Sequence, residues 1–188
     1  MAVSITQLKV GLTILVDGQV HQVAEAQHVK PGKGAAFVRT KLKNMETGAL
    51  FEKTFREVDK AEEAFVEEKK MQYLYRANEM YHFMDQQTYE EVDLSENLLA
   101  DKAKFLKDNL EVVAYFYKGK ALSINLPNFI QVRITKTEPG IKGDTAKAGT
   151  KSAQIETGAS IQVPLFINTG DTIKVDTRSG EYIERTAI

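Results

Sequence analysis

The stretch LTILVDGQVHQV at residues 12–23 is the clearest structural signal in this 188-residue sequence. Two runs of β-forming residues flank Asp17-Gly18. A two-residue type I′ turn requires positive φ at both central positions, and Asp-Gly accommodates this well. We therefore expect a tight β-hairpin here.

The next stretch, AAFVRTKLK at 35–43, alternates in character, and successive side chains of a strand point to opposite faces. One predicted face holds Ala36, Val38, Thr40 and Leu42, and the other holds Phe37, Arg39, Lys41 and Lys43. The second face is thus basic with one aromatic. A turn over NMETG at 44–48 and a returning strand at 49–55 complete a meander typical of a small barrel.

Strand patterns continue through most of the remaining chain. Residues 71–85 predict a hairpin that turns at Asn78-Glu79, and residues 110–117 predict another strand. Between them lies one predicted short helix, because Ser95 is a suitable N-cap and apolar residues follow at helical spacing. These apolar residues are Leu99, Ala103, Leu106 and Leu110.

The last block, 128–188, reads as strands separated by Gly-rich loops. We assign the strand-like run that contains Pro164 to an edge strand or a bulge, because proline cannot donate a hydrogen bond to the sheet. We therefore predict an all-β chain of three small β-barrels, with domains at 1–64, 65–127 and 128–188.

Composition narrows the class of protein. The chain has no cysteine, which excludes disulfides, thiolate nucleophiles and cysteine-ligated zinc. No apolar run approaches the ~20 residues of a membrane helix, and the N-terminus does not resemble a signal peptide. We expect a cytoplasmic protein that acts as a monomer and does not contact the membrane.

The net charge of −1 conceals an uneven distribution. Counting Lys and Arg against Asp and Glu, residues 1–60 carry +3, residues 61–128 carry −5 and residues 129–188 carry +1. This asymmetry favours an oriented molecule that meets phosphate at one end. Segregation of charge by chance is the alternative interpretation.

No catalytic constellation is present, and we expect neither an enzyme nor a cofactor or metal site. The histidines His21, His28 and His82 lack metal-ligand spacing, and a lone histidine in a strand is usually structural. There is no nucleophile elbow, Walker loop or dinucleotide fingerprint. Adjacent carboxylates such as Glu90-Glu91 point to opposite faces of a strand and do not form an acid–base pair.

The segment Lys30-Pro31-Gly32-Lys33-Gly34 lies between two predicted strands and therefore at a hairpin tip. Pro31 fixes φ at the turn entrance, and the two glycines permit backbone conformations that other residues disfavour. Lys33 is then the one long side chain at the apex, so the tip can enter a narrow space. An ordinary turn with a solvated lysine is the alternative. Nearby cations favour a phosphate contact, and they are Lys30, Arg39, Lys41 and Lys43.

Two long motifs carry a resemblance to a known family. HVKPGKGAAFVRTKLKN at 28–44 resembles the tip hairpin of the bacterial translation elongation factor P family, and residues 138–186 resemble its third domain. The signature of that domain is Lys-x-Ala, then a Gly, and Val-Pro ahead of a further Gly. It is matched by Lys151, Ala153, Gly158, Val163, Pro164 and Gly170. The resemblance extends over essentially the whole chain.

This resemblance implies a KOW/SH3-like barrel followed by two OB-type barrels, in an L-shaped, tRNA-like arrangement. It implies binding to both ribosomal subunits between the peptidyl and exit sites, contact with peptidyl-tRNA, and relief of stalling at consecutive prolines. Lys33 matches the apical lysine that many members extend post-translationally, which implies a modifying enzyme as a further partner. Gly143, Asp144 and Thr145 match the family's loop near the exit-site codon.

Three other interpretations stay open from the sequence. One is a paralogue of the factor with the same architecture, although the Pro-Gly-Lys-Gly tip favours the factor itself. Another is a generic RNA-binding module of OB barrels, which would present exposed aromatic residues for base stacking. The third is an enzyme with Lys33 as a Schiff-base nucleophile, but that role requires a desolvated lysine rather than one at an exposed tip.

Overall fold

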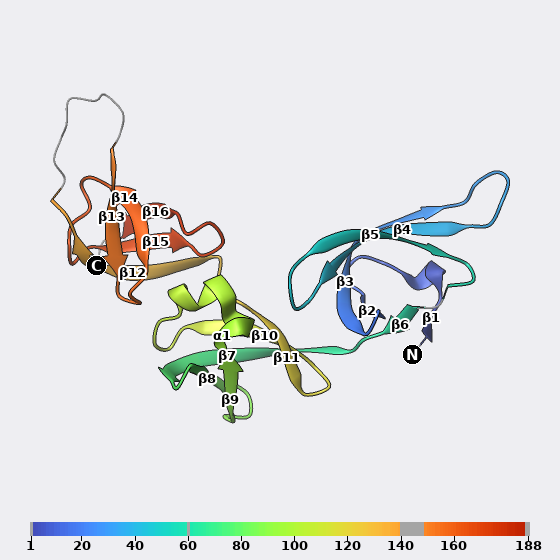
Figure 1. Ribbon diagram of the computed structural model, residues 1–188, viewed down its shortest axis with the longest axis horizontal. Coiled ribbons are helices and arrows are strands. Elements are labelled where there is room, and N and C mark those ends of the chain that lie inside the picture. The colour runs from blue at the N-terminus through green and yellow to red at the C-terminus, as the bar shows by residue number, and fades with distance from the viewer. Residues whose placement is uncertain (1, 60, 140–148, 187–188) are drawn as a thin grey trace. The chain divides into compact units, whose positions relative to one another are not determined.

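The computed structural model describes residues 2–59, 61–139 and 149–186, and it contains three curled sheets and one short helix (Figure 1). The prediction of an all-β chain is therefore confirmed. The chain groups into two compact units, Met1–Lys69 with Ala114–Ser123 and Lys70–Val113 with Ile124–Ile188. The domain boundaries near residues 64 and 127 stay predictions. In the described parts of the chain, no helix is long and apolar enough to cross a membrane.

The first sheet has six strands, and a 3₁₀ turn at Ile5–Gln7 lies between the first two of them in the chain. The strands are β1 (Ala2–Val3), β2 (Thr13–Val16), β3 (Gln19–Val29), β4 (Phe37–Asn44), β5 (Leu50–Arg56) and β6 (Ala61–Glu63). Their order in the sheet is β1-β6-β2-β3-β4-β5. The predicted hairpin at 12–23 is present, because Asp17 and Gly18 join β2 to β3 with φ values of 52° and 79°.

The predicted inner face of β4 packs into the core of this sheet. Val38, Thr40 and Leu42 are buried, and Ala36 is half-buried just before the strand. The Thr40 hydroxyl donates a hydrogen bond to the Lys53 carbonyl at 2.8 Å, which satisfies the buried polar group. Their apolar neighbours in this core include Ile5, Leu8, Ile14, Val16, Val23 and Phe55. The alternating pattern therefore sets which side of β4 faces solvent.

The second sheet has the strand order β11-β10-β7-β8-β9. Its strands are β7 (Val66–Ala77), β8 (Met80–Asp85), β9 (Glu91–Ser95), β10 (Glu111–Tyr117) and β11 (Lys120–Asn125). The predicted turn at Asn78-Glu79 joins β7 to β8, with φ values of 48° and 65°. Tyr73, Tyr81 and Phe83 are buried here.

The helix in this region is shorter than its apolar spacing suggested. The α-helix α1 covers only Glu96–Leu99, and a 3₁₀ helix at Ala100–Phe105 follows it. The break lies at Ala100, whose φ of 46° and ψ of −132° interrupt the helical backbone. Ser95 has the extended backbone of an N-cap but makes no side-chain capping hydrogen bond. The predicted short helix is therefore confirmed, but helical backbone does not continue to Leu110. Leu99, Leu106 and Leu110 are nevertheless all buried.

The third sheet has the strand order β14-β13-β12-β15-β16. Its strands are β12 (Phe129–Thr137), β13 (Thr150–Ile155), β14 (Ser160–Pro164), β15 (Thr172–Asp176) and β16 (Tyr182–Thr186). Pro164 ends an edge strand, as predicted. The turn after β15 is held by Asp176, whose carboxylate accepts hydrogen bonds from the Arg178 side chain and backbone. These bonds lower the pKa of Asp176 from 3.8 to about 2.

The backbone at Ala100 predicts an unusual response to glycine. At its φ and ψ an L-residue is strained by ~1–3 kcal/mol, whereas glycine is not. After the higher entropy of glycine in the unfolded chain is subtracted, Ala100→Gly is expected to raise the free energy of unfolding by ~1 kcal/mol. The matched control Ala103→Gly, at negative φ in the same 3₁₀ segment, is expected to lower it by up to ~1 kcal/mol. Urea unfolding measures both, and a loss of stability in both variants would contradict the prediction.

Candidate functional site

The loop between β3 and β4 forms the tip that the sequence singled out. The last residue pair of the two strands is Val29 with Phe37, and residues 30–36 close the hairpin beyond it. Figure 1 shows this loop extending past the ends of the other strands in its sheet. The predicted position of the Pro-Gly-Lys-Gly motif at a hairpin apex is therefore found in the fold.

Lys33 at this apex is open to solvent. Its side chain is exposed, and its Nζ makes no hydrogen bond or ion pair with any residue in the described ranges. The same is true of Lys30 at the start of the loop. Lys33 does not occupy a desolvated pocket, so the structure offers no support for a Schiff-base nucleophile, which depends on burial to lower the pKa of the amine.

The two tip glycines differ in what the backbone requires of them. Gly34 has a φ of +108°, which L-residues rarely adopt, and its position beside Pro31 is open enough for a Cβ. Gly32 does not have positive φ, and a Cβ there would meet nothing within 4 Å. The interpretation that both glycines serve conformational freedom is therefore right for Gly34 and wrong for Gly32. The contribution of Gly32 is only that it adds no side chain beside Lys33, which keeps the tip narrow.

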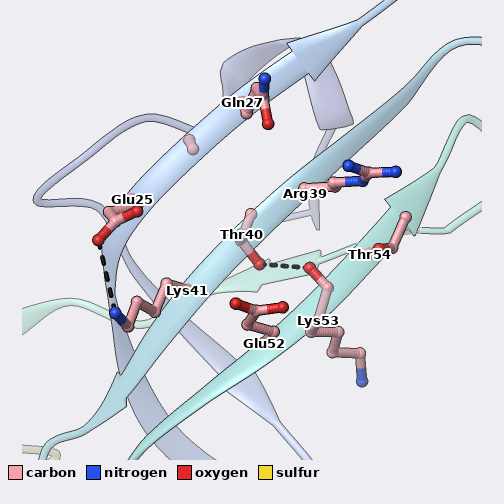
Figure 2. Close-up of a pocket in the computed structure, with 9 residues that line it drawn as sticks. Glu25, Gln27, Arg39, Thr40, Lys41, Glu52, Lys53 and Thr54 are labelled. Atoms are coloured by element: carbon pink, nitrogen blue, oxygen red, sulfur yellow. Dashed lines mark hydrogen bonds and ion pairs between the residues drawn. The ribbon is translucent and has the colours of Figure 1, made fainter.

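The outer face of this sheet carries a shallow depression of about 480 Å³ below the tip (Figure 2). Strands β3, β4 and β5 contribute its lining, and the strand register sets neighbouring side chains in rows. Nearer the tip, Gln27, Arg39 and Thr54 occupy paired positions, and the next row is Glu25, Lys41 and Glu52. The predicted outer face of β4 is thus confirmed, but acidic residues share it.

Because of these acidic residues, the candidate cations differ in how free they are to contact an external phosphate. Lys41 Nζ lies 3.6 Å from the Glu25 carboxylate, and Figure 2 shows its side chain turned toward that residue. The Arg39 guanidinium instead lies over the Phe37 ring, 5.6 Å from its centroid. Arg39 and the exposed Lys43 have no carboxylate partner within 4.0 Å among the described residues. Arg39 is therefore better placed than Lys41 to contact an external phosphate.

Arg56 is a cation of this face that the sequence reading missed. It is exposed, and it pairs in register with Phe37 at the end of β5. It therefore lies one row nearer the tip than Arg39. The register of the β4–β5 hairpin could have revealed it, because the turn at 44–48 determines which residues of the two strands face each other.

Two of the three histidines have structural roles, as predicted. His21 is buried, and its Nδ1 lies 3.0 Å from the Gln19 carbonyl. His28 Nε2 lies 2.9 Å from the Leu8 carbonyl. Among the residues that the structure describes, neither has a hydrogen bond to a carboxylate or hydroxyl group that would make a catalytic pair.

Family models cover the chain in three consecutive parts. Residues 4–61 match the model for the elongation factor P (EF-P) KOW-like domain, residues 66–124 match its OB domain, and residues 130–185 match its C-terminal domain. Elongation factor P of Thermoanaerobacter sp. (strain X514) is 57% identical over 93% of this chain and 95% of that protein. Elongation factor P of Moorella thermoacetica is 55% identical over 97% of this chain and 99% of that protein. The chain belongs to the elongation factor P family.

Solved structures agree with this assignment. A eukaryotic translation initiation factor 5A from Methanococcus jannaschii has a TM-score of 0.54 and 26% identity, covering 67% of this chain and 92% of that one. A translation initiation factor eIF-5A family protein from Naegleria fowleri has a TM-score of 0.52 at 18% identity, covering 67% and 98%, and shows the fold alone. The elongation factor P family consists of translation factors, so the expectation that this chain is not an enzyme is confirmed.

The two tip glycines give a matched pair of variants. Gly34→Ala places a Cβ on a left-handed backbone, which costs ~1–2 kcal/mol unless the loop rearranges. We expect amide NMR shifts to change across residues 30–36 in Gly34→Ala, and only next to the substitution in Gly32→Ala. Melting temperatures of both should stay close to the parent value, because a loop that buries no core side chain can rearrange and relieve the strain. Equal and loop-wide shift changes in the two variants would contradict the distinction.

Proposed function

We propose that this chain binds the ribosome between the peptidyl and exit sites and stimulates peptide-bond formation where consecutive prolines stall translation. The observation that carries the proposal is an exposed lysine at the apex of a hairpin, without a partner among the described residues, in a member of a translation factor family. In this proposal Lys33 reaches toward the acceptor end of the peptidyl-tRNA in the peptidyl-transferase centre. Action in the cytoplasm as a monomer belongs to the same proposal.

A positioning role suits the chemistry of the tip. Proline is a rigid and poor nucleophile, so the orientation of the two reactants limits the reaction more than proton transfer does. A factor that holds peptidyl-tRNA in a productive geometry lowers the activation free energy mainly by reducing its entropic cost. A ~100-fold gain in rate needs this free energy to fall by only ~2.7 kcal/mol. A flexible cationic side chain can contact the tRNA backbone without displacing the reacting groups.

The exposed amine also suits covalent modification. Lys33 Nζ is free of intramolecular partners in the described chain, and the residues on both sides of it are glycines. A modifying enzyme can therefore reach it without unfolding the hairpin. We propose that such an enzyme extends Lys33 and that the longer side chain increases the reach of the tip.

A second contact is proposed for the third domain. Gly143, Asp144 and Thr145 match the family's loop near the exit-site codon, and they lie outside the described residues. The flanking strands β12 and β13 are paired antiparallel, with Thr137 opposite Ala153. The proposed role of the loop rests on the motif alone.

Substitution of Lys33 tests the proposal directly. Lys33→Ala is expected to abolish relief of polyproline stalling while changing the stability by no more than ~0.5 kcal/mol, because the side chain buries no apolar area. Lys33→Arg keeps the charge but loses an amine-directed modification, and we expect it to fail nearly as badly. The matched control is Lys9→Ala, which removes another exposed lysine of the same unit.

The assay is in vitro synthesis of a reporter with a run of prolines, compared with a proline-free reporter. The factor is purified from its native host so that any modification is retained. Full rescue by Lys33→Ala would remove the apical lysine from the mechanism. Full rescue by Lys33→Arg would show that charge is sufficient and that modification is dispensable.

The outer face of the hairpin gives a separate binding test. If Arg39 contacts a phosphate, Arg39→Gln should weaken ribosome binding and reduce the slope of log K against log salt by about one. The control is the double variant Glu25→Gln/Lys41→Gln, which removes the ion pair without altering the net charge. We expect this control to bind like the wild type. Equal weakening in the two proteins, measured by sedimentation over a salt series, would contradict the proposed role of Arg39.

A further inference from the structure

Three metal-ligating side chains converge on the outer face of the second sheet. His82 comes from β8, and Glu91 and Asp93 come from β9. His82 Nδ1 lies 2.8 Å from Glu91 Oε1 and 2.8 Å from Asp93 Oδ1. All three donor atoms lie within 4.8 Å of one another. This cluster has no part in the function proposed above.

Strand geometry explains why these residues meet. Glu91 and Asp93 are two residues apart in one strand, so both side chains point to the same face. His82 is directly opposite Asp93 in the antiparallel register. The alternation of β8 buries Tyr81 and Phe83 and leaves His82 on the outer face. The sequence shows no metal-ligand spacing, because the donors come from two paired strands.

Hydrogen bonds within this cluster do not compensate the charges of its two carboxylates. An imidazole nitrogen carries at most one proton, yet two carboxylate oxygens approach Nδ1 of His82 at the same distance. Neither Glu91 nor Asp93 has a Lys or Arg partner within 4.0 Å among the described residues. Two negative charges therefore face at most one positive charge, and a bound cation would compensate both.

A neighbouring tyrosine holds two of the donors in place. The Tyr75 ring stacks on the His82 ring, with centroids 4.3 Å apart and an interplanar angle of 15°. Its hydroxyl donates a hydrogen bond to Glu91 Oε1 at 3.1 Å. The His82 side chain is only 15% exposed, whereas the two carboxylates are about half exposed. Supporting contacts of this kind orient ligands in metal sites.

We propose that His82, Glu91 and Asp93 bind one divalent transition-metal ion, with Zn²⁺ the best fit. One imidazole nitrogen and two carboxylate oxygens form a mixed donor set that suits Zn²⁺, whereas Mg²⁺ and Ca²⁺ prefer oxygen alone. Metal–ligand bonds of ~2.1 Å place the donors of a tetrahedral site ~3.4 Å apart. The two carboxylate oxygens lie 2.8 Å from His82 Nδ1, so each needs to move only slightly away from it. Water completes the coordination on the exposed side. The bound ion ties the edge strand β9 to β8.

Titration of the untagged full-length chain with Zn²⁺, against a chelator of known affinity, tests this site. We expect one equivalent to bind to the wild type, and His82→Gln, Glu91→Gln and Asp93→Asn each to weaken that binding by at least ~10-fold. Tyr75→Phe keeps the stacked ring and loses the hydrogen bond to Glu91, so we expect a smaller loss. His28→Gln is the matched control, because His28 has no carboxylate partner among the described residues. It should bind Zn²⁺ like the wild type.

Imidazole NMR of the wild type gives a measurement that does not depend on a variant's folding. Addition of Zn²⁺ should shift the His82 resonances and leave those of His21 and His28 in place. Ca²⁺ at the same concentration should shift none of them. Absence of Zn²⁺ binding to the wild type, unchanged binding in His82→Gln, or an equal loss in His28→Gln would overturn the proposal.

Discussion

The antiparallel pairing of β3 with β4 is the constraint on which the first unit depends. One face of this pair supplies buried side chains to the core, and the opposite face presents the candidate RNA-contacting cations. Because side chains alternate along a strand, a shift of the register by one residue would exchange the two faces. The same register carries the chain past Val29 and Phe37 into the tip loop. The position of Lys33 is therefore fixed by the pairing of strands far below it.

The charges on this face are graded along the hairpin. At the tip end, Arg39 and Arg56 have no acidic residue opposite them in the strand register, and Lys30 and Lys33 lie in the loop beyond the last strand pair. One row below Arg39, Lys41 lies between Glu25 and Glu52. Positive charge is therefore concentrated where the hairpin extends beyond its sheet. Carboxylates below the tip would repel phosphate along the rest of the face, so the proposed contact with nucleic acid is favoured at the tip end.

Local signals in the sequence predicted the parts of the fold that local geometry determines. The Asp17-Gly18 turn, the alternation of β4 and the edge position of Pro164 all follow from rules that involve a few neighbouring residues. The break at Ala100 was missed, because its φ of 46° is a value that alanine rarely adopts and that no residue type in the sequence indicates. The pairing of Lys41 with Glu25 and the His82 cluster were also missed, because each depends on register between strands.

The tip separates its proposed function from the stability of the fold. Its side chains bury no core area, so the free energy of folding comes from the paired strands and the apolar cluster beneath them. Positive φ at Gly34 is the one backbone requirement of the described loop, and it constrains shape without adding bulk beside Lys33. A side chain in such a place is free to be lengthened or replaced without cost to the core. The stability of the hairpin base is what allows the apex to remain unpartnered and available to a ligand.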